Sequence, residues 1–204
     1  MKKLTLLFLL LSLSMTAQTE NEAVAAIKNF QKELNDEYLN PKESPLRGNN
    51  LKDFKKHPFF PVNLKYRLIA DFIKTTDAKP IDFPTSSGQF QKYLEFGKAT
   101  FVLDGKSYTL TIYQNLRLSG KSGYEDYLFL PFRDETNGKE TYGGGKYIDL
   151  RIPQDDKITI DFNQSYQPFC AYNAYDYSCP IVPEENTLPV KIEAGVMYDD
   201  VYHH

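Results

Sequence analysis

The chain has 204 residues, a formal net charge of −3, 15 tyrosines, 14 phenylalanines and no tryptophan. This length predicts one domain that buries a core of its own without help from metal ions or many disulfides, and no cofactor is predicted. Acidic and basic residues are mixed along the chain, so the charge pattern argues against a nucleic-acid-binding protein, which would carry a basic patch.

Residues 1–18 have the pattern of a secretory signal peptide. Lys2 and Lys3 precede an apolar run at 4–13, and small or polar residues follow as far as Gln18. The run is much shorter than the roughly 20 residues that a membrane span needs. We therefore expect cleavage after Ala17 or Gln18 and a mature protein in the periplasm or outside the cell. An uncleaved N-terminal anchor is the alternative.

Residues 19–40 are predicted to form an amphipathic helix. Apolar residues recur at spacings of three and four from Ala23 to Tyr38, and Asn40-Pro41 ends the pattern. Residues 41–62 are rich in proline, glycine and asparagine, which predicts a linker loop with one helical turn inside it.

Residues 63–204 are predicted to form a β domain. Asp104-Gly105 separates two strand-like runs within 100–113, which is a strong signal for a two-residue hairpin. Further strands are expected at 64–72, 127–132, 147–152, 158–162 and 188–192. Seven or eight short strands of this kind predict a mostly β fold, either an antiparallel β-sandwich or a partly open barrel.

Few residues suggest catalysis or metal binding. His57 is the only histidine before the C-terminal pair, and no Gly-x-Ser-x-Gly motif supplies a nucleophile. A loop histidine without a catalytic role is the favoured interpretation of His57. Zinc motifs are missing from the sequence, and no metal site is predicted.

Cys170 and Cys179 are the only cysteines. Because the expected compartment is oxidising, we expect them to form a disulfide. Two buried free thiols are the alternative.

Three blocks of the C-terminal half carry a family resemblance. They lie at 129–149, 161–173 and 179–188, the first beginning Phe-Leu-Pro-Phe-Arg-Asp-Glu and the third Cys-Pro-Ile-Val-Pro-Glu-Glu-Asn. The chain thereby resembles the bacterial domain-of-unknown-function family number 1684, in the form of an exported Bacteroidetes-type member. The resemblance implies no activity. Lys146 and Val196 depart from the family pattern, in which many relatives carry Arg and Glu.

A polar pocket is expected around Asp161, Asn163, Glu185 and Asn186. Asp161 and Asn163 are two residues apart on a predicted strand, so their side chains point the same way. Arg133, Tyr142 and Lys146 are expected at the rim. The alternative is a hydrogen-bond network that ties the C-terminal segment to the sheet.

The leading functional hypothesis is a non-enzymatic envelope protein that binds a small or extended polar ligand. A hydrolase that uses carboxylates or Tyr and Lys side chains in the same pocket is the alternative, and a structural or protein-interaction role is the third. The candidate ligand-binding residues are Arg133, Asp134, Tyr142, Lys146, Asp149, Asp161, Asn163, Tyr166, Tyr172, Glu185 and Asn186.

Overall fold

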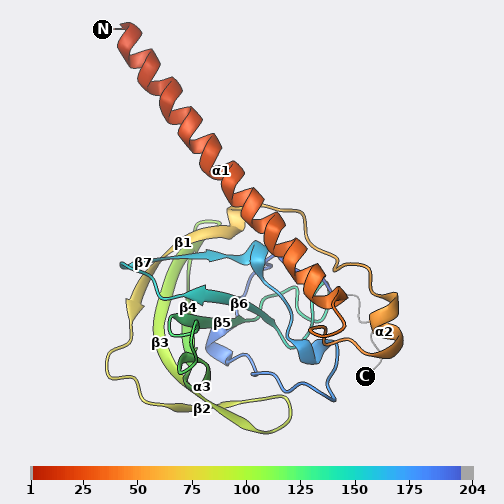
Figure 1. Ribbon diagram of the computed structural model, residues 1–204. Helices are drawn as coiled ribbons and strands as arrows, with labels where there is room; N and C mark the ends of the chain where they lie inside the picture. Colours follow the sequence, from red (N-terminus) through yellow and green to blue (C-terminus); the bar gives the residue numbers. More distant parts are fainter. Residues whose placement is uncertain (1, 199–204) are drawn as a thin grey trace.

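Seven antiparallel strands form one sheet that curls into a half-barrel (Figure 1). The computed structural model describes the backbone of residues 2–198 and the side chains from Thr19, so the side chains of the expected signal peptide lie outside the described residues. The strand order is β6-β5-β4-β3-β1-β7, and β2 pairs with β3. The mostly β prediction is confirmed, in its partly open barrel form.

The elements have the following bounds. The strands are β1 (Arg67–Lys74), β2 (Ile81–Pro84), β3 (Phe90–Leu103), β4 (Lys106–Asn115), β5 (Tyr127–Phe132), β6 (Lys146–Arg151) and β7 (Lys157–Asp161). The helices are α1 (Lys2–Leu39), α2 (Gly48–Asp53) and α3 (Leu116–Ser119), with 3-10 turns η1 (Leu64–Tyr66), η2 (Phe162–Gln164), η3 (Phe169–Ala171) and η4 (Glu184–Asn186).

The two faces of the sheet are covered differently because side chains alternate along each strand. On β5, Leu128 and Leu130 enter the main core, whereas Phe129 between them belongs to a second, tyrosine-rich cluster. On β6, Ile148 enters the main core and Tyr147 the second cluster. The second face is therefore buried at this end of the sheet as well.

The hairpin between β3 and β4 forms as the sequence predicts. Asp104 and Gly105 have φ values of 49° and 76°, and Leu103 pairs directly with Lys106. Positive φ at both central residues gives the turn whose twist matches that of the flanking strands.

Two predicted strands differ from the structure. Residues 188–192 form no strand. Pro189 has no N–H to donate, and the Ile192 N–H is bonded to the Asp134 carboxylate at 3.2 Å. At the start of the predicted 64–72 strand, Asn63 accepts a hydrogen bond from the Lys65 N–H and begins the turn η1 instead.

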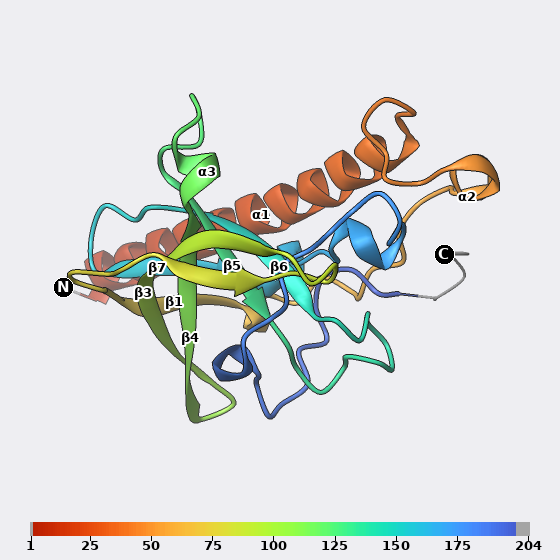
Figure 2. The same cartoon turned by 90° about the horizontal axis from the view of Figure 1, so that it is seen from below.

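Helix α1 runs along one side of the sheet (Figure 2). Leu34 and Tyr38 pack with Leu46, Phe54 and Tyr172 in a third hydrophobic cluster. The segment predicted as a linker thus contributes buried side chains between α1 and the β domain. Within the part of the chain whose side chains are described, no helix is long and apolar enough to span a membrane.

Candidate functional site

Asp161 and Asn163 bind the segment that precedes β1. Asp161 accepts hydrogen bonds from Arg67 at 3.1 Å and from the Asn163 amide at 2.9 Å. Asn163 also exchanges two 3.0 Å hydrogen bonds with the backbone of Asn63. The pair therefore fastens the end of β7 to the chain that enters β1.

Asn186 performs a similar role between β4 and β5. Its side-chain amide accepts from the Thr111 N–H at 2.8 Å and donates to the carbonyls of Thr111 and Pro131 at 2.8 and 2.7 Å. The neighbouring Glu185 is exposed and accepts a 2.7 Å hydrogen bond from Tyr113. Among the described residues, no hydrogen bond or ion pair joins Glu185 or Asn186 to the Asp161–Asn163 pair.

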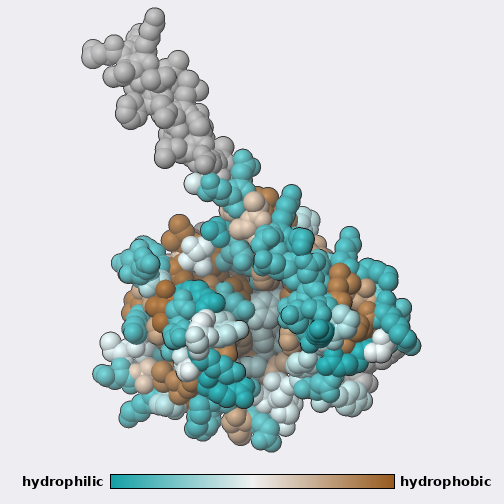
Figure 3. All heavy atoms as spheres, in the orientation of Figure 1, coloured by the Kyte–Doolittle hydropathy of each residue, from teal (hydrophilic) through white to brown (hydrophobic). Residues whose placement is uncertain are grey.

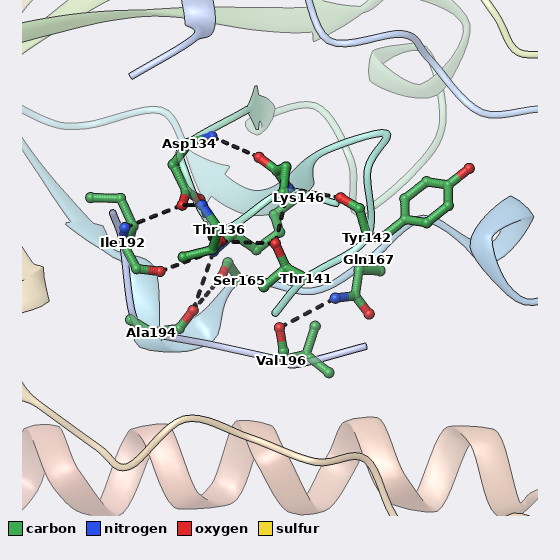
Figure 4. A network of polar contacts seen from close by, with 11 residues as sticks. Asp134, Thr136, Thr141, Tyr142, Lys146, Ser165, Gln167, Ile192, Ala194 and Val196 are labelled. Atoms are coloured by element: carbon green, nitrogen blue, oxygen red, sulfur yellow. Dashed lines mark hydrogen bonds and ion pairs between the residues drawn. The ribbon is translucent and has the colours of Figure 1, made fainter. Parts of the chain in front are cut away.

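Lys146 and Asp134 form a buried ion pair (Figure 4). Their charged atoms lie 2.9 Å apart and neither side chain is exposed. Lys146 also donates to the carbonyls of Ile192 and Ala194 at 3.1 and 3.5 Å. Burial lowers the pKa of Lys146, while the Asp134 carboxylate opposes that shift. This network ties the C-terminal segment to the start of β6.

The predicted rim residues Arg133 and Tyr142, and the further candidate Tyr172, also contact other parts of the fold. The backbone of Arg133 is bonded to Asn186 and Leu188. The Tyr142 ring packs edge-on against Tyr198, and the Tyr172 hydroxyl donates to Gln167 at 2.8 Å. A ligand-binding role for the proposed Asp161, Asn163, Glu185 and Asn186 pocket stays a prediction, and the contacts are those of the network alternative.

Three of the candidates line cavities: Tyr172 lines one beside Arg47 and Asp176, and Asp149 and Tyr166 lie together at another. The Asp149 carboxylate accepts hydrogen bonds from the hydroxyls of Tyr127 and Tyr166, at 2.8 and 2.6 Å. Part of the Asp149 side chain contacts solvent, but the dense protein around the carboxyl raises its pKa, and the two hydroxyl donors oppose this shift. Burial and the carboxylate charge raise the pKa of both phenols, so both stay protonated donors.

We call the adjoining cavity the tyrosine pocket. Its volume is about 270 Å³, and its lining includes the aromatic residues Tyr93, Tyr127, Phe129, Tyr147, Tyr166, Phe169 and Tyr177. The hydrophobicity-coloured surface is hollowed near its middle, between the sheet and the segments that follow β7 (Figure 3). The pocket lies on the second face of the sheet, where side-chain alternation along the strands places Tyr93, Phe129 and Tyr147.

Most polar groups in the pocket wall are already engaged. The Tyr147 hydroxyl donates to the Pro180 carbonyl, and Asn115 donates to Gln91 at 3.0 Å. The pocket therefore presents mainly aromatic surface.

A second cavity, which we call the α1 cleft, lies between α1 and β6. Phe30, Leu34, Glu37 and Asp149 line it, and its volume is about 260 Å³. Burial and the negative charges of Glu43 and Asp149 raise the pKa of Glu37. Tyr166 and Phe169 border both the α1 cleft and the tyrosine pocket, so they separate the two.

Cys179 lines the tyrosine pocket, and Cys170 lies beside it. Both are buried free thiols, and the Cys170 N–H donates to the Cys179 sulfur at 3.1 Å. Their pairing as a disulfide stays a prediction. Among the described residues, no group of three or more His, Cys, Asp and Glu side chains is arranged to hold a metal.

Sequence reasoning missed Tyr93, Tyr127, Tyr147 and Glu37. A usable signal was present for two of them, since Tyr127 and Tyr147 alternate with Leu128 and Ile148 on predicted strands. Glu37 belongs to α1 and approaches Asp149 only through packing of the whole helix, so no local pattern indicates it.

A comparison with family models matches residues 52–197 to the family described as "Protein of unknown function (DUF1684)". The chain belongs to this family. The chain is similar to the solved structure of an uncharacterized protein from Haloarcula marismortui. The two share 32% sequence identity with a TM-score of 0.69, and the match covers 91% of this chain and 98% of that one. No curated protein matches the chain. Membership in the DUF1684 family therefore assigns no activity, and a function has to be inferred from the geometry of the site.

Proposed function

We propose that this DUF1684 protein binds a small ligand in the tyrosine pocket and acts outside the cytoplasm. One observation carries the binding proposal: the rings of Tyr93, Phe129, Tyr147 and Tyr166 follow one another as a continuous row along a cavity of about 270 Å³. Pockets that bind small molecules are concave and mostly apolar, with a few polar groups that fix orientation. The signal-peptide pattern of residues 1–18 supports the proposed location.

A thermal-shift screen of the purified protein tests the binding proposal. Sugars, nucleosides, amines and short peptides are the compounds to screen. A ligand at 100 times its Kd stabilises the folded state by about 2.7 kcal/mol, which raises Tm by roughly 5 °C or more. Tyr177→Leu, at the half-buried edge of the pocket, should weaken the shift.

The matched control is Tyr175→Leu, because Tyr175 is 84% exposed and does not line the pocket. Its shift should equal that of the unaltered protein. Shifts that survive Tyr177→Leu unchanged, with contacts mapped by NMR to another surface, would refute binding in the tyrosine pocket.

One observation favours the hydrolase alternative. Glu37 and Asp149 face the same cleft, and burial raises the pKa of each, as a general acid requires. Lys146 does not favour it, since the buried ion pair encloses its amine. Turnover of nitrophenyl glycosides or esters that disappears in both Glu37→Gln and Asp149→Asn would establish this alternative. No turnover would argue against the hydrolase alternative.

A further inference from the structure

The aromatic rings of the tyrosine pocket meet at steep angles. Phe129 and Tyr147 have ring centroids 4.7 Å apart and planes inclined by 74°, and Tyr147 and Tyr166 are 6.0 Å apart at 89°. On the segment that follows β7, Phe169 and Tyr177 pack at 5.1 Å and 78°. Near-perpendicular rings from two parts of the chain form adjoining walls of one cavity, as in an aromatic cage.

The charged group bonded to the wall of the tyrosine pocket is negative: it is Asp149, which itself lines the neighbouring α1 cleft. Among the described residues that line it, none is a lysine or an arginine. Asp149 lies behind Tyr127 and Tyr166 and accepts a hydrogen bond from each hydroxyl. A phenol that donates to a carboxylate has a more electron-rich ring, whose face attracts cations more strongly.

Two arginines act on the edges of this region without lining the pocket. Arg117 is exposed on α3, and its positive charge acts to lower the pKa of the Tyr93 hydroxyl. The charge of Arg151 acts to lower the pKa of Asp149, but the Arg151 guanidinium is bonded to Asp126 at 2.7 Å. Neither places a positive charge in the pocket wall.

The wall also disfavours ligands that need many hydrogen bonds. Tyr127 and Tyr166 donate to Asp149, Tyr147 donates to Pro180, and Asn115 donates to Gln91. A sugar would have to displace these bonds, because its hydroxyls lose their water partners on binding. A methylated ammonium group requires no hydrogen bond and gains attraction from ring faces.

We propose that the tyrosine pocket binds an organic cation that carries a tertiary or quaternary ammonium group. The inference rests on the proposed binding function and adds the class of ligand. The ring faces contact the methyl groups of the cation, and the Asp149 carboxylate stabilises its charge through the two phenols. Asp149 is thus a positioning residue that acts through Tyr127 and Tyr166.

A pair of isosteric probes tests this inference on the unaltered protein. Choline carries a trimethylammonium group, and 3,3-dimethylbutan-1-ol has the same shape with a neutral carbon in place of nitrogen. Titration followed by NMR gives a Kd for each probe and identifies the tyrosines that respond. We expect choline to bind at least roughly tenfold more tightly than the neutral alcohol, with shifts at pocket tyrosines.

Variants separate the charge from the shape of the pocket. Asp149→Asn keeps a hydrogen-bond acceptor for both phenols, so we expect it to reduce the preference for choline while the neutral alcohol binds as before. Tyr177→Leu should weaken choline binding, and Tyr175→Leu should not. Circular dichroism confirms that each variant is folded before it is titrated.

Three results would overturn the inference. Equal affinity for both probes would refute the cationic class and leave the binding function intact. The same conclusion follows if neither probe shifts pocket tyrosines while another compound class from the thermal-shift screen does. If no compound class perturbs the pocket, the proposed binding function fails together with the inference.

Discussion

At the scale of single residues, Lys146 shows how burial decides a role. Its amine is paired with Asp134 and with two carbonyls of the C-terminal segment. Breaking a buried ion pair leaves an uncompensated charge, which costs about 3–5 kcal/mol. We therefore expect Lys146→Met to lower the free energy of unfolding by this amount in urea denaturation.

The exposed pair of Lys191 and Glu140 supplies the control for Lys146. Their side chains are 43% and 31% exposed, so Lys191→Met should lower the free energy of unfolding far less than Lys146→Met does. Replacing both Asp134 and Lys146 by apolar residues should restore much of the stability that Lys146→Met loses. A Lys146→Met protein as stable as the unaltered one would contradict the structural role.

The two cysteines give a second prediction at this scale. The interaction with the Cys179 side chain lowers the pKa of the Cys170 thiol. We expect the pair to oxidise to a disulfide in an oxidising compartment. Closing a loop of about ten residues stabilises the folded state by about 2.7 kcal/mol in the chain-entropy model.

Two measurements check the disulfide. Titration of the denatured, unreduced protein should find no free thiol, and reductant should lower the urea midpoint. The Cys170→Ser, Cys179→Ser double variant should not respond to reductant. Two titratable thiols in protein recovered from an oxidising compartment would rule the disulfide out.

The residues of the candidate site were only partly predictable. Asp149 and Tyr166 were among the candidates because the family resemblance marked their positions. Asn186 was marked too, yet its amide is fully engaged between β4 and β5. A sequence pattern can indicate that a polar residue is constrained, but it does not distinguish a buried structural amide from one that contacts a ligand.

At the scale of elements, α1 is held to the β domain by a buried histidine. His57 is 2% exposed, and its backbone N–H donates to Asn35 of α1 at 2.7 Å. The Tyr38 ring of α1 packs edge-on against the imidazole at 4.2 Å, and the Tyr172 ring packs against both, 5.6 Å from the imidazole and 5.0 Å from Tyr38. The histidine expected in a linker loop is therefore part of the contact between α1 and the domain.

The stability of this contact should depend on pH. Burial lowers the pKa of His57 from 6.5 to about 3. Between these values the unfolded chain binds a proton at His57 and the folded chain does not, so the free energy of unfolding falls as pH falls from 6.5 towards 3. The His57 contribution to this slope is at most about 1.4 kcal/mol per pH unit.

His57→Leu isolates the histidine contribution, because all other titrating groups are kept. The difference in unfolding free energy between the two proteins should shift in favour of the variant as pH falls from 6.5 to 4. Parallel stability curves across this range would show that His57 does not titrate as its burial demands.

The elements themselves were predictable where one local rule dominates. The Asp104-Gly105 turn and β5 follow from turn chemistry and an apolar run. The first half of β3 was missed because a β-bulge between Glu95 and Gly97 breaks the alternation of side chains. A Cβ at Gly97 would lie 2.5 Å from the Phe72 ring, a close approach that only the paired strands reveal.

At the scale of the whole molecule, the half-barrel has an open side between β6 and β7, its two edge strands. The α1 cleft lies at this side, between α1 and β6. Ile27, Leu34 and Tyr38 of α1 are buried. Helix α1 from Thr19 onward therefore belongs to the folded domain, although the DUF1684 family model begins at residue 52.

The cleavage expected from the signal-peptide pattern is compatible with this arrangement. A signal peptide cleaved after Ala17 or Gln18 would leave all three buried α1 residues in place, so a chain that begins at Thr19 should unfold with the stability of the exported protein. A chain that begins at residue 41 loses three buried side chains, each worth roughly 1.5–3 kcal/mol, and should be destabilised by about 5 kcal/mol or more.

N-terminal sequencing of protein recovered from the periplasm or medium should find Gln18 or Thr19 first. Intact Met1 on cytoplasmic protein would refute the export proposal, and equal stability of the chain from residue 41 would refute the structural role of α1.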